Sequence, residues 1–321
     1  MTKALVNRIM NIYDNRINIL NVKQGELRMK KKLIFNSSLV VVVWLISLVI
    51  GSVLVQNVFQ ERLENTLFSD YIQMIVLYLF VIAMILTITK LLKQDSLIKE
   101  IKLINFRIGL MGVLSILICF GGDIFLLVEF IKTLLEKKEL GTIILAEPYL
   151  FIMSMIAYFL VGFSEELCFR GIVLKMWINQ DREKNRSWIK PTLVISIVFG
   201  LVHLVNLSNG LYFANIVYTL AQVLFASMYG VIFSGIMRKT NSVLCCGLIH
   251  GTINLLGNSA ELIVSINIMN IIPKEIMDQH SVLSGLITII VVIPGFLWGI
   301  HVCKNKNTIG ALYESDIEAR A

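Results

Sequence analysis

Three short groups of polar residues interrupt otherwise apolar stretches of this sequence, and their residue types are those of acid–base chemistry. In chain order the groups are Glu165, Glu166 and Arg170; Phe199 and His203; and His250 and Asn254. The first group follows an uncharged run of sixteen residues, "YLFIMSMIAYFLVGFS". Carboxylates and imidazoles transfer protons, and imidazole and amide N–H groups can stabilise a developing oxyanion. These side chains are therefore candidates for acid–base chemistry within apolar segments.

The surrounding composition is typical of a membrane protein. The 321 residues are 56% hydrophobic and 16% charged, with a mean hydropathy of +0.77, whereas a soluble domain has about 25% charged residues. Several uncharged runs are as long as the ~20 residues that cross a bilayer. An ionisable residue at the centre of such a span costs at least ~2.5–3.5 kcal/mol, so it is a functional candidate by default.

The sequence therefore predicts an all-α polytopic membrane protein with about eight transmembrane helices and a buried polar site. The predicted spans are 33–55, 71–89, 107–131, 149–177, 190–207, 211–237, 241–259 and 282–303. They divide the chain into four parts: a basic cytoplasmic segment (1–32), N-terminal transmembrane helices (33–131), a catalytic transmembrane core (145–260), and a final part with an extramembrane loop, the last span and a cytoplasmic tail (261–321). For residues 4–20 three alternatives are open: a helix along the cytoplasmic surface, an unstructured segment, or translation that starts at Met29 rather than Met1.

The net charge of +7 follows the expected membrane topology. Lys and Arg concentrate in the N-terminal segment and in alternate loops, which is the positive-inside pattern of membrane proteins and not a nucleic-acid-binding stripe. We therefore expect a multi-pass protein of the cell membrane with both termini in the cytoplasm. The five Cys lie in or beside apolar segments without paired spacing, so no disulfide framework is predicted.

Helix geometry places the three polar groups at one depth. At a rise of 1.5 Å per residue, Glu165, His203 and His250 lie ~15–20 Å from the cytoplasmic lysines that flank their spans. The hydrocarbon core is ~30 Å thick, so all three groups are expected near its middle.

The spacing of the first group predicts a division of roles between its two carboxylates. Glu166 and Arg170 are four residues apart, so they share one helix face and can neutralise each other. Glu165 points about a quarter turn away and is free to face the two histidines. A purely structural Glu166–Arg170 ion pair remains an open alternative.

The other two groups repeat the four-residue spacing. His250 and Asn254 present a paired donor surface, and Phe199 lies one helical turn from His203. A single intramembrane histidine is often only an interhelical hydrogen bonder. The convergence of several such groups favours a functional site.

Taken in order, the three groups resemble the motifs of a known family. Glu165-Glu166-x-x-x-Arg170, Phe199-x-x-x-His203 and His250-x-x-x-Asn254 are similar to the EExxxR, FxxxH and HxxxN motifs of the CAAX protease and bacteriocin-processing (CPBP, or Abi) family of intramembrane proteases. The resemblance covers about residues 145–260, with no departure at the motif positions. It implies hydrolysis of a peptide bond in a membrane-associated substrate. In the family, eukaryotic members cleave prenylated C-terminal tripeptides, and bacterial members are associated with bacteriocin immunity or peptide processing.

The resemblance also implies a role for each residue. Glu165 would be the general base that activates a water molecule, and His203 would help to hold and polarise that water. His250 and Asn254 would form the oxyanion hole. Glu166 and Arg170 would fix the local geometry, and Phe199 completes the predicted site.

Metal dependence is the main chemical alternative. Family names often include the word metalloprotease, and Glu165, His203 and His250 are competent Zn ligands. HExxH is absent, however, and Asn254 is a poor Zn ligand, so we expect a glutamate-dependent site without a cofactor. The expected partners are a membrane-bound peptide or protein substrate and the lipid bilayer, with no nucleic acid. A non-catalytic bacteriocin-immunity or membrane scaffolding protein of the same fold remains open, whereas a transporter is disfavoured because no inverted repeat is visible.

Overall fold

The computed structural model describes residues 3–59, 67–94, 147–179, 188–258 and 274–305. Every regular element in these ranges is helical. The elements are α1 (Lys3–Phe59), α2 (Leu67–Leu91), α5 (Pro148–Glu166), the π-helix η2 (Leu167–Leu174), α6 (Lys175–Asn179), α7 (Ile189–Leu201), the 3₁₀-helix η3 (Val202–Asn209), α8 (Phe213–Thr240), α9 (Val243–Gly257) and α12 (Lys274–Lys304). The predicted all-α class is confirmed.

Six helical segments among the described residues are long and apolar enough to cross a membrane. They are Gln24–Phe59, Leu67–Leu91, Pro148–Asn179, Ile189–Asn209, Phe213–Thr240 and Ser281–Lys304, and α9 is a shorter apolar helix. Seven of the eight predicted spans correspond to these segments, and the remaining one, 107–131, lies outside the described residues. The chain is therefore a multi-pass membrane protein, roughly as predicted.

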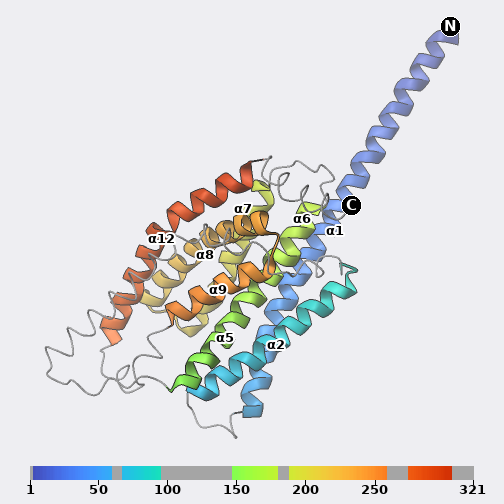
Figure 1. Ribbon diagram of the computed structural model, residues 1–321. Coiled ribbons are helices and arrows are strands. Elements are labelled where there is room, and N and C mark those ends of the chain that lie inside the picture. The colour runs from blue at the N-terminus through green and yellow to red at the C-terminus, as the bar shows by residue number, and fades with distance from the viewer. Residues whose placement is uncertain (1–2, 60–66, 95–146, 180–187, 259–273, 306–321) are drawn as a thin grey trace, which may run out of the picture.

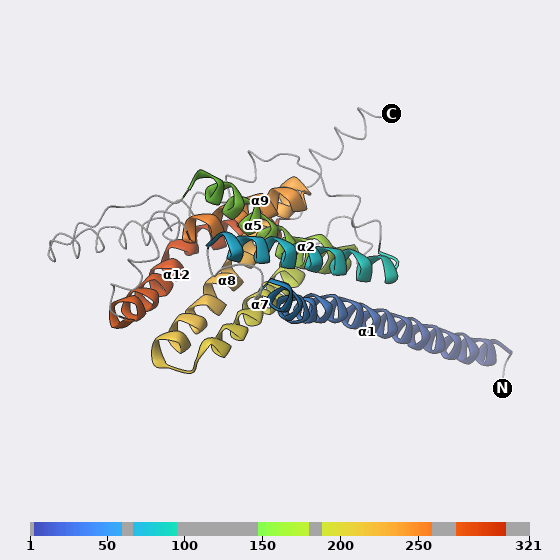
Figure 2. The same ribbon diagram turned by 90° about the horizontal axis from the view of Figure 1, so that it is seen from below.

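The first helix is much longer than a bilayer is thick. α1 has 57 residues, which corresponds to ~86 Å at 1.5 Å per residue, against a hydrocarbon core of ~30 Å. Its N-terminal part projects from the helical bundle as a single rod (Figures 1 and 2). The backbone of residues 4–20 is thus helical and continues into the first span.

The bundle is built from helix pairs that lie side by side (Figure 1). α5 packs against α9, α7 against α8, and α8 against α12, while α1 and α2 pack against each other and α2 also against α5. The fully buried side chains at the centre come from several of these helices and include Phe169, Phe233 and Ile236. Large apolar side chains such as Val49, Ile197 and Ile290 are exposed on the outside, as expected for a surface that faces lipid.

Small residues allow α5 and α9 to approach closely. Gly247 and Gly251, four residues apart on α9, lie against Phe163 and Phe159 of α5. A Cβ atom added at Gly162 of α5 would lie only 2.5 Å from the backbone nitrogen of Gly251. Small residues at this spacing are typical of tightly packed membrane helices. The contact brings the helix of the first polar group next to the helix of the third.

Small residues also allow α7 and α8 to approach closely. Gly230 of α8 faces Ser196 of α7, with room for no further carbon atom between them. Gly200 of α7 is similarly in close contact with Ser227 of α8. Phe199 on α7, with His203 following on η3, is therefore held close to α8.

Several basic helix ends meet at one end of the bundle. The backbone N–H of Trp188, at the start of α7, donates to the carbonyl oxygen of Cys303 at the end of α12. Arg238, at the end of α8, donates to the same carbonyl over 3.1 Å and lies 5.1 Å from the Trp188 ring. Trp177 of α6 donates to Ser37 of α1. Lys190, Lys239 and Lys304, which flank these helix ends, therefore lie at one end of the bundle.

Candidate functional site

The first polar group lies where α5 changes its helical form. Glu166 is the last residue of α5, and the following eight residues, Leu167–Leu174, form a π-helix in which every side chain is buried. π-helical turns are rare and occur frequently at functional sites. The wider turn carries Arg170, so the carboxylates and the guanidinium project from the junction between two helix types.

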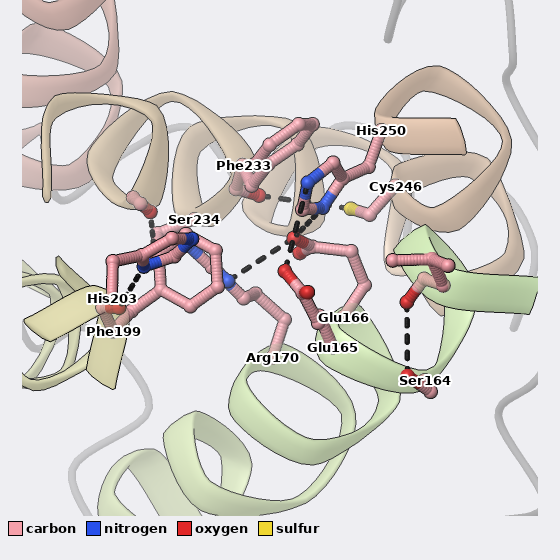
Figure 3. Close-up of polar contacts among 12 residues, drawn as sticks. Ser164, Glu165, Glu166, Arg170, Phe199, His203, Phe233, Ser234, Cys246 and His250 are labelled. Atoms are coloured by element: carbon pink, nitrogen blue, oxygen red, sulfur yellow. Dashed lines mark hydrogen bonds and ion pairs between the residues drawn. The ribbon is translucent and has the colours of Figure 1, made fainter. Parts of the chain in front are cut away.

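Glu166 joins two of the three polar groups. Its Oε1 atom accepts a hydrogen bond from Nη1 of Arg170 over 3.1 Å, which confirms the predicted pairing. The same oxygen lies 2.9 Å from Nδ1 of His250 on α9. An ionised carboxylate only accepts hydrogen bonds, so Nδ1 of His250 is the donor in this contact. Figure 3 shows His250 extending from α9 towards both glutamates.

Glu165 has a different environment from its neighbour. Its Oε2 atom lies 3.7 Å from Nε2 of His250, the opposite ring nitrogen from the one that binds Glu166. The side chain of Glu165 is 13% exposed and that of His250 is 11% exposed, whereas Glu166 and Arg170 are completely buried. Glu165 is thus the carboxylate of the pair that a water molecule can reach.

Aromatic rings enclose the buried cation. The Cζ atom of Arg170 lies 4.4 Å from the centre of the Phe199 ring, 5.5 Å from that of Phe233 and 6.0 Å from that of Phe169. Among the described residues, Nε and Nη2 of Arg170 have no hydrogen-bond partner. Contacts with the faces of aromatic rings, together with the Glu166 carboxylate, are therefore the interactions that offset the desolvation of this charge.

The imidazole of His250 is also in contact with rings on two sides. The Phe233 ring is stacked on it, with 5.0 Å between centroids and 21° between planes. Phe199 approaches it edge-on, at 6.1 Å and 80°. Phe199, which the sequence predicted as a site residue, therefore contacts both Arg170 and His250. Phe233 was not predicted, because an apolar residue on an apolar helix carries no sequence signal of a role.

The second predicted histidine lies at the edge of this cluster. His203 belongs to η3, just after α7 tightens from an α- to a 3₁₀-helix, and its Nδ1 atom lies 3.1 Å from the carbonyl oxygen of Phe199. Its ring packs edge-on against Phe199 at 5.4 Å, as the four-residue spacing predicted. Within the described part of the chain, the Phe199 ring connects His203 with His250, and Glu165 forms its ion pair with His250.

Asn254 follows His250 by one turn on α9 and is half-buried. Its backbone carbonyl accepts a hydrogen bond from the side chain of Asn258 near the end of the helix. The Asn254 side chain therefore extends from the same helix as His250, one turn further along the chain. A further residue outside the predicted set is Tyr78 of α2, whose phenol lies within electrostatic reach of the Glu165 carboxylate.

The described residues form no ready-made zinc site with three protein ligands. A catalytic zinc ion usually has three protein ligands, and no group of three His, Cys, Asp or Glu side chains with suitable geometry occurs in the described ranges. Nδ1 of His250 contacts Glu166 and Nδ1 of His203 contacts a backbone carbonyl, so Nε2 is the ring nitrogen of each histidine that is left for another partner. What the cluster can do is accept a proton at Glu165 and donate hydrogen bonds from α9.

Fold and site together define a multi-pass membrane protein with a carboxylate–imidazole pair in its interior. Residues 147–256 match the family model described as type II CAAX prenyl endopeptidase Rce1-like. This part of the chain is therefore similar to the CAAX prenyl endopeptidase domain, in agreement with the resemblance of its motifs. No curated protein and no solved structure matches the chain. The matched range runs from α5 into α9 and includes all three polar groups.

Proposed function

We propose that this chain is a glutamate-dependent intramembrane endopeptidase in which Glu165 activates the attacking water. The observation that carries the proposal is the contrast between two adjacent carboxylates. Glu166 is completely buried and hydrogen-bonded to Arg170 and His250, whereas Glu165 is partly exposed beside Nε2 of His250. A general base must reach the proton that it removes, and of the two only Glu165 has exposed side-chain surface.

The reaction follows from the arrangement of these side chains. Glu165 accepts a proton from water as the water oxygen bonds to the peptide carbonyl carbon, which leaves a tetrahedral oxyanion. The side-chain amide of Asn254 and Nε2–H of His250 in its protonated imidazolium form, one turn apart on α9, donate hydrogen bonds to that oxyanion. When the C–N bond breaks, the proton held by Glu165 is transferred to the leaving amine. The products are a carboxylic acid and an amine, which become a carboxylate and an ammonium group by proton transfer, and the proposed steps use no metal ion.

The Glu166–Arg170 pair supports this chemistry without entering it. The two charges cancel inside the membrane, where an isolated ion would be costly. Glu166 also holds Nδ1 of His250, so Nε2 is left to face Glu165. His203 packs edge-on against Phe199 at the edge of the site. Its proposed role is to hold the water or the substrate there.

The substrate class follows from the family description and from the membrane location of the site. We propose a membrane-associated peptide or protein, with or without a prenyl group, whose scissile bond reaches the interior of the bundle from the lipid phase or its surface. A farnesylated peptide that ends in a CAAX sequence, and the same peptide without the farnesyl group, are the two probes that distinguish these possibilities.

The test is proteolysis of both probes in membranes that contain the full-length protein. Glu165→Gln keeps the size of the side chain but cannot accept the proton, so cleavage should fall by about 10²–10⁴-fold. Glu147→Gln is the matched control, because Glu147 lies exposed at the other end of the same helix. An active Glu165→Gln enzyme would place the base elsewhere. Absence of cleavage by the wild type, in a strain that the protein still protects from a bacteriocin, would favour the non-catalytic immunity role.

A further inference from the structure

α8 carries none of the three polar groups, yet one of its residues touches two of them. The ring of Phe233 is stacked on the His250 imidazole and lies 5.5 Å from the guanidinium carbon of Arg170. Phe233 is completely buried, so its ring belongs to the interior and not to the lipid-facing surface. Figure 3 shows this ring against His250, on the side away from Glu165.

The hydrogen bond to Glu166 does not by itself fix the imidazole. It sets the distance between Nδ1 and Oε1 at 2.9 Å, but a concerted change of χ1 and χ2 of His250 can keep that distance while it tilts the ring and moves Nε2. A flat surface at 5.0 Å and 21° limits that rotation, and the edge of Phe199 at 6.1 Å limits it from another side. The aromatic contacts therefore determine where Nε2 points, and Nε2 is the atom that faces Glu165.

The backbone of Phe233 contacts α9, and this contact does not involve the Phe233 ring. Its carbonyl oxygen lies 3.7 Å from Sγ of Cys246, which precedes His250 by one helical turn. Replacement of the ring by another apolar side chain leaves this contact and the small-residue packing of α5 against α9 in place. The ring and the helix contact can thus be tested separately.

We propose that Phe233 is a positioning residue of the site. Its ring fixes the plane of the His250 imidazole and thereby aims Nε2 at the space that Glu165 faces. The inference rests on the proposed peptidase function for its kinetic consequence. The restraint of the His250 ring by Phe233 does not depend on whether the protein cleaves a substrate.

The kinetic test compares Phe233→Leu, which removes the ring, with Phe233→Tyr, which keeps it. A small misplacement of a catalytic group can cost up to about 100-fold in rate, so Phe233→Leu should lower kcat by about 10- to 100-fold with little change in KM. Phe233→Tyr should recover most of that loss. Phe225→Leu is the matched control, because Phe225 lies two turns earlier on α8 and its ring contact is with Tyr229.

A chemical test separates this inference from the proposed function. Diethyl pyrocarbonate modifies accessible imidazoles, and its rate at His250 can be measured by peptide mass spectrometry on the purified full-length protein. Phe233→Leu should raise that rate several-fold, whereas Phe233→Tyr and Phe225→Leu should leave it near the wild-type value. This result would support the inference even if the wild type cleaved no probe, an outcome that would count against the proposed function alone.

Two results would overturn the inference. One is an unchanged modification rate at His250 in Phe233→Leu. The other is a loss of kcat in Phe233→Leu that Phe225→Leu or Phe233→Tyr reproduces. If Phe233→Leu does not accumulate, Phe233→Met supplies a flexible apolar side chain of similar volume, and the same two readouts decide.

Discussion

His250 binds Glu166 through Nδ1 at 2.9 Å, across the interface between α9 and α5 and over 84 positions of sequence. The oxygen that accepts this bond is the one that Arg170 also binds. Glu166 is therefore more than the counter-ion of Arg170, because it also anchors the imidazole that faces Glu165. Loss of its charge should disturb both the fold and the site.

The first prediction concerns that shared acceptor. Glu166→Gln leaves Arg170 as an uncompensated buried cation, and breakage of such a pair can cost ~3–5 kcal/mol. We expect a clear loss of membrane abundance and of thermal stability, together with a loss of activity per molecule. Addition of Arg170→Met should recover abundance, because the buried charge is removed, but it should not recover cleavage. Normal abundance of the single variant would show that Glu166 is not needed as a counter-ion.

The second prediction concerns the contact between α5 and α9. A Cβ atom at Gly162 would meet the backbone of Gly251 at 2.5 Å, so Gly162→Ala must push the two helices apart. Overpacking of this kind costs typically ~1–3 kcal/mol, and the shift separates His250 from Glu166. Thermal unfolding and proteolysis should both report the change. Gly257→Ala, on α9 with nothing within 4 Å, is the control and should behave like the wild type.

The sequence predicted the helices and the local pairs of the site well, for a physical reason. Apolar length determines whether a helix can cross a bilayer, and Glu166 with Arg170, or Phe199 with His203, meet because four residues make about one turn. Such contacts depend on one helix only, so they can be derived from spacing.

The long-range part of the site could not be derived in this way. The contact of Glu166 with His250 depends on how closely α5 and α9 approach, and the π-helical turn after Glu166 depends on packing around it. The expectation that Glu165 faces both histidines holds for His250, whereas His203 makes its hydrogen bond with the Phe199 carbonyl. No pattern in the sequence indicated that Phe233 belongs to the site, because its proposed role depends on contacts with residues of other helices.

The third prediction concerns the donors on α9 and η3. Asn254→Ala removes an oxyanion donor and should lower kcat by about 10²–10³-fold, while the backbone carbonyl that Asn258 binds is retained. His203→Ala should likewise reduce activity with little loss of stability, since the side chain is half-buried at the edge of the cluster. Thr252→Ala, an exposed site on α9, is the control. Wild-type rates in Asn254→Ala would remove the amide from the proposed oxyanion hole.

The fourth prediction is that activity survives removal of metal. The described residues offer no group of three ligands, so we expect purified protein to contain far less than one metal ion per chain. Cleavage after treatment with a chelator should match that of the untreated enzyme. Stoichiometric zinc, with activity lost on chelation and restored by added zinc, would reverse the assignment.

The fifth prediction concerns the orientation of the chain in the membrane. Trp188, Arg238 and Cys303 bring the start of α7 and the ends of α8 and α12 together. Lys190, Lys239 and Lys304 flank these ends, and the positive-inside rule assigns such a basic surface to the cytoplasm.

Reporter fusions near Lys184 and after Ala321 should therefore both give cytoplasmic signals. A fusion at Gly210, between η3 and α8 at the opposite end of these helices, should give the reverse signal and serves as the internal control. A signal from the far side at Lys184 or Ala321 would contradict the orientation. A far-side signal at only one of these positions would require an odd number of membrane crossings between them, whereas the predicted spans 190–207, 211–237, 241–259 and 282–303 give four.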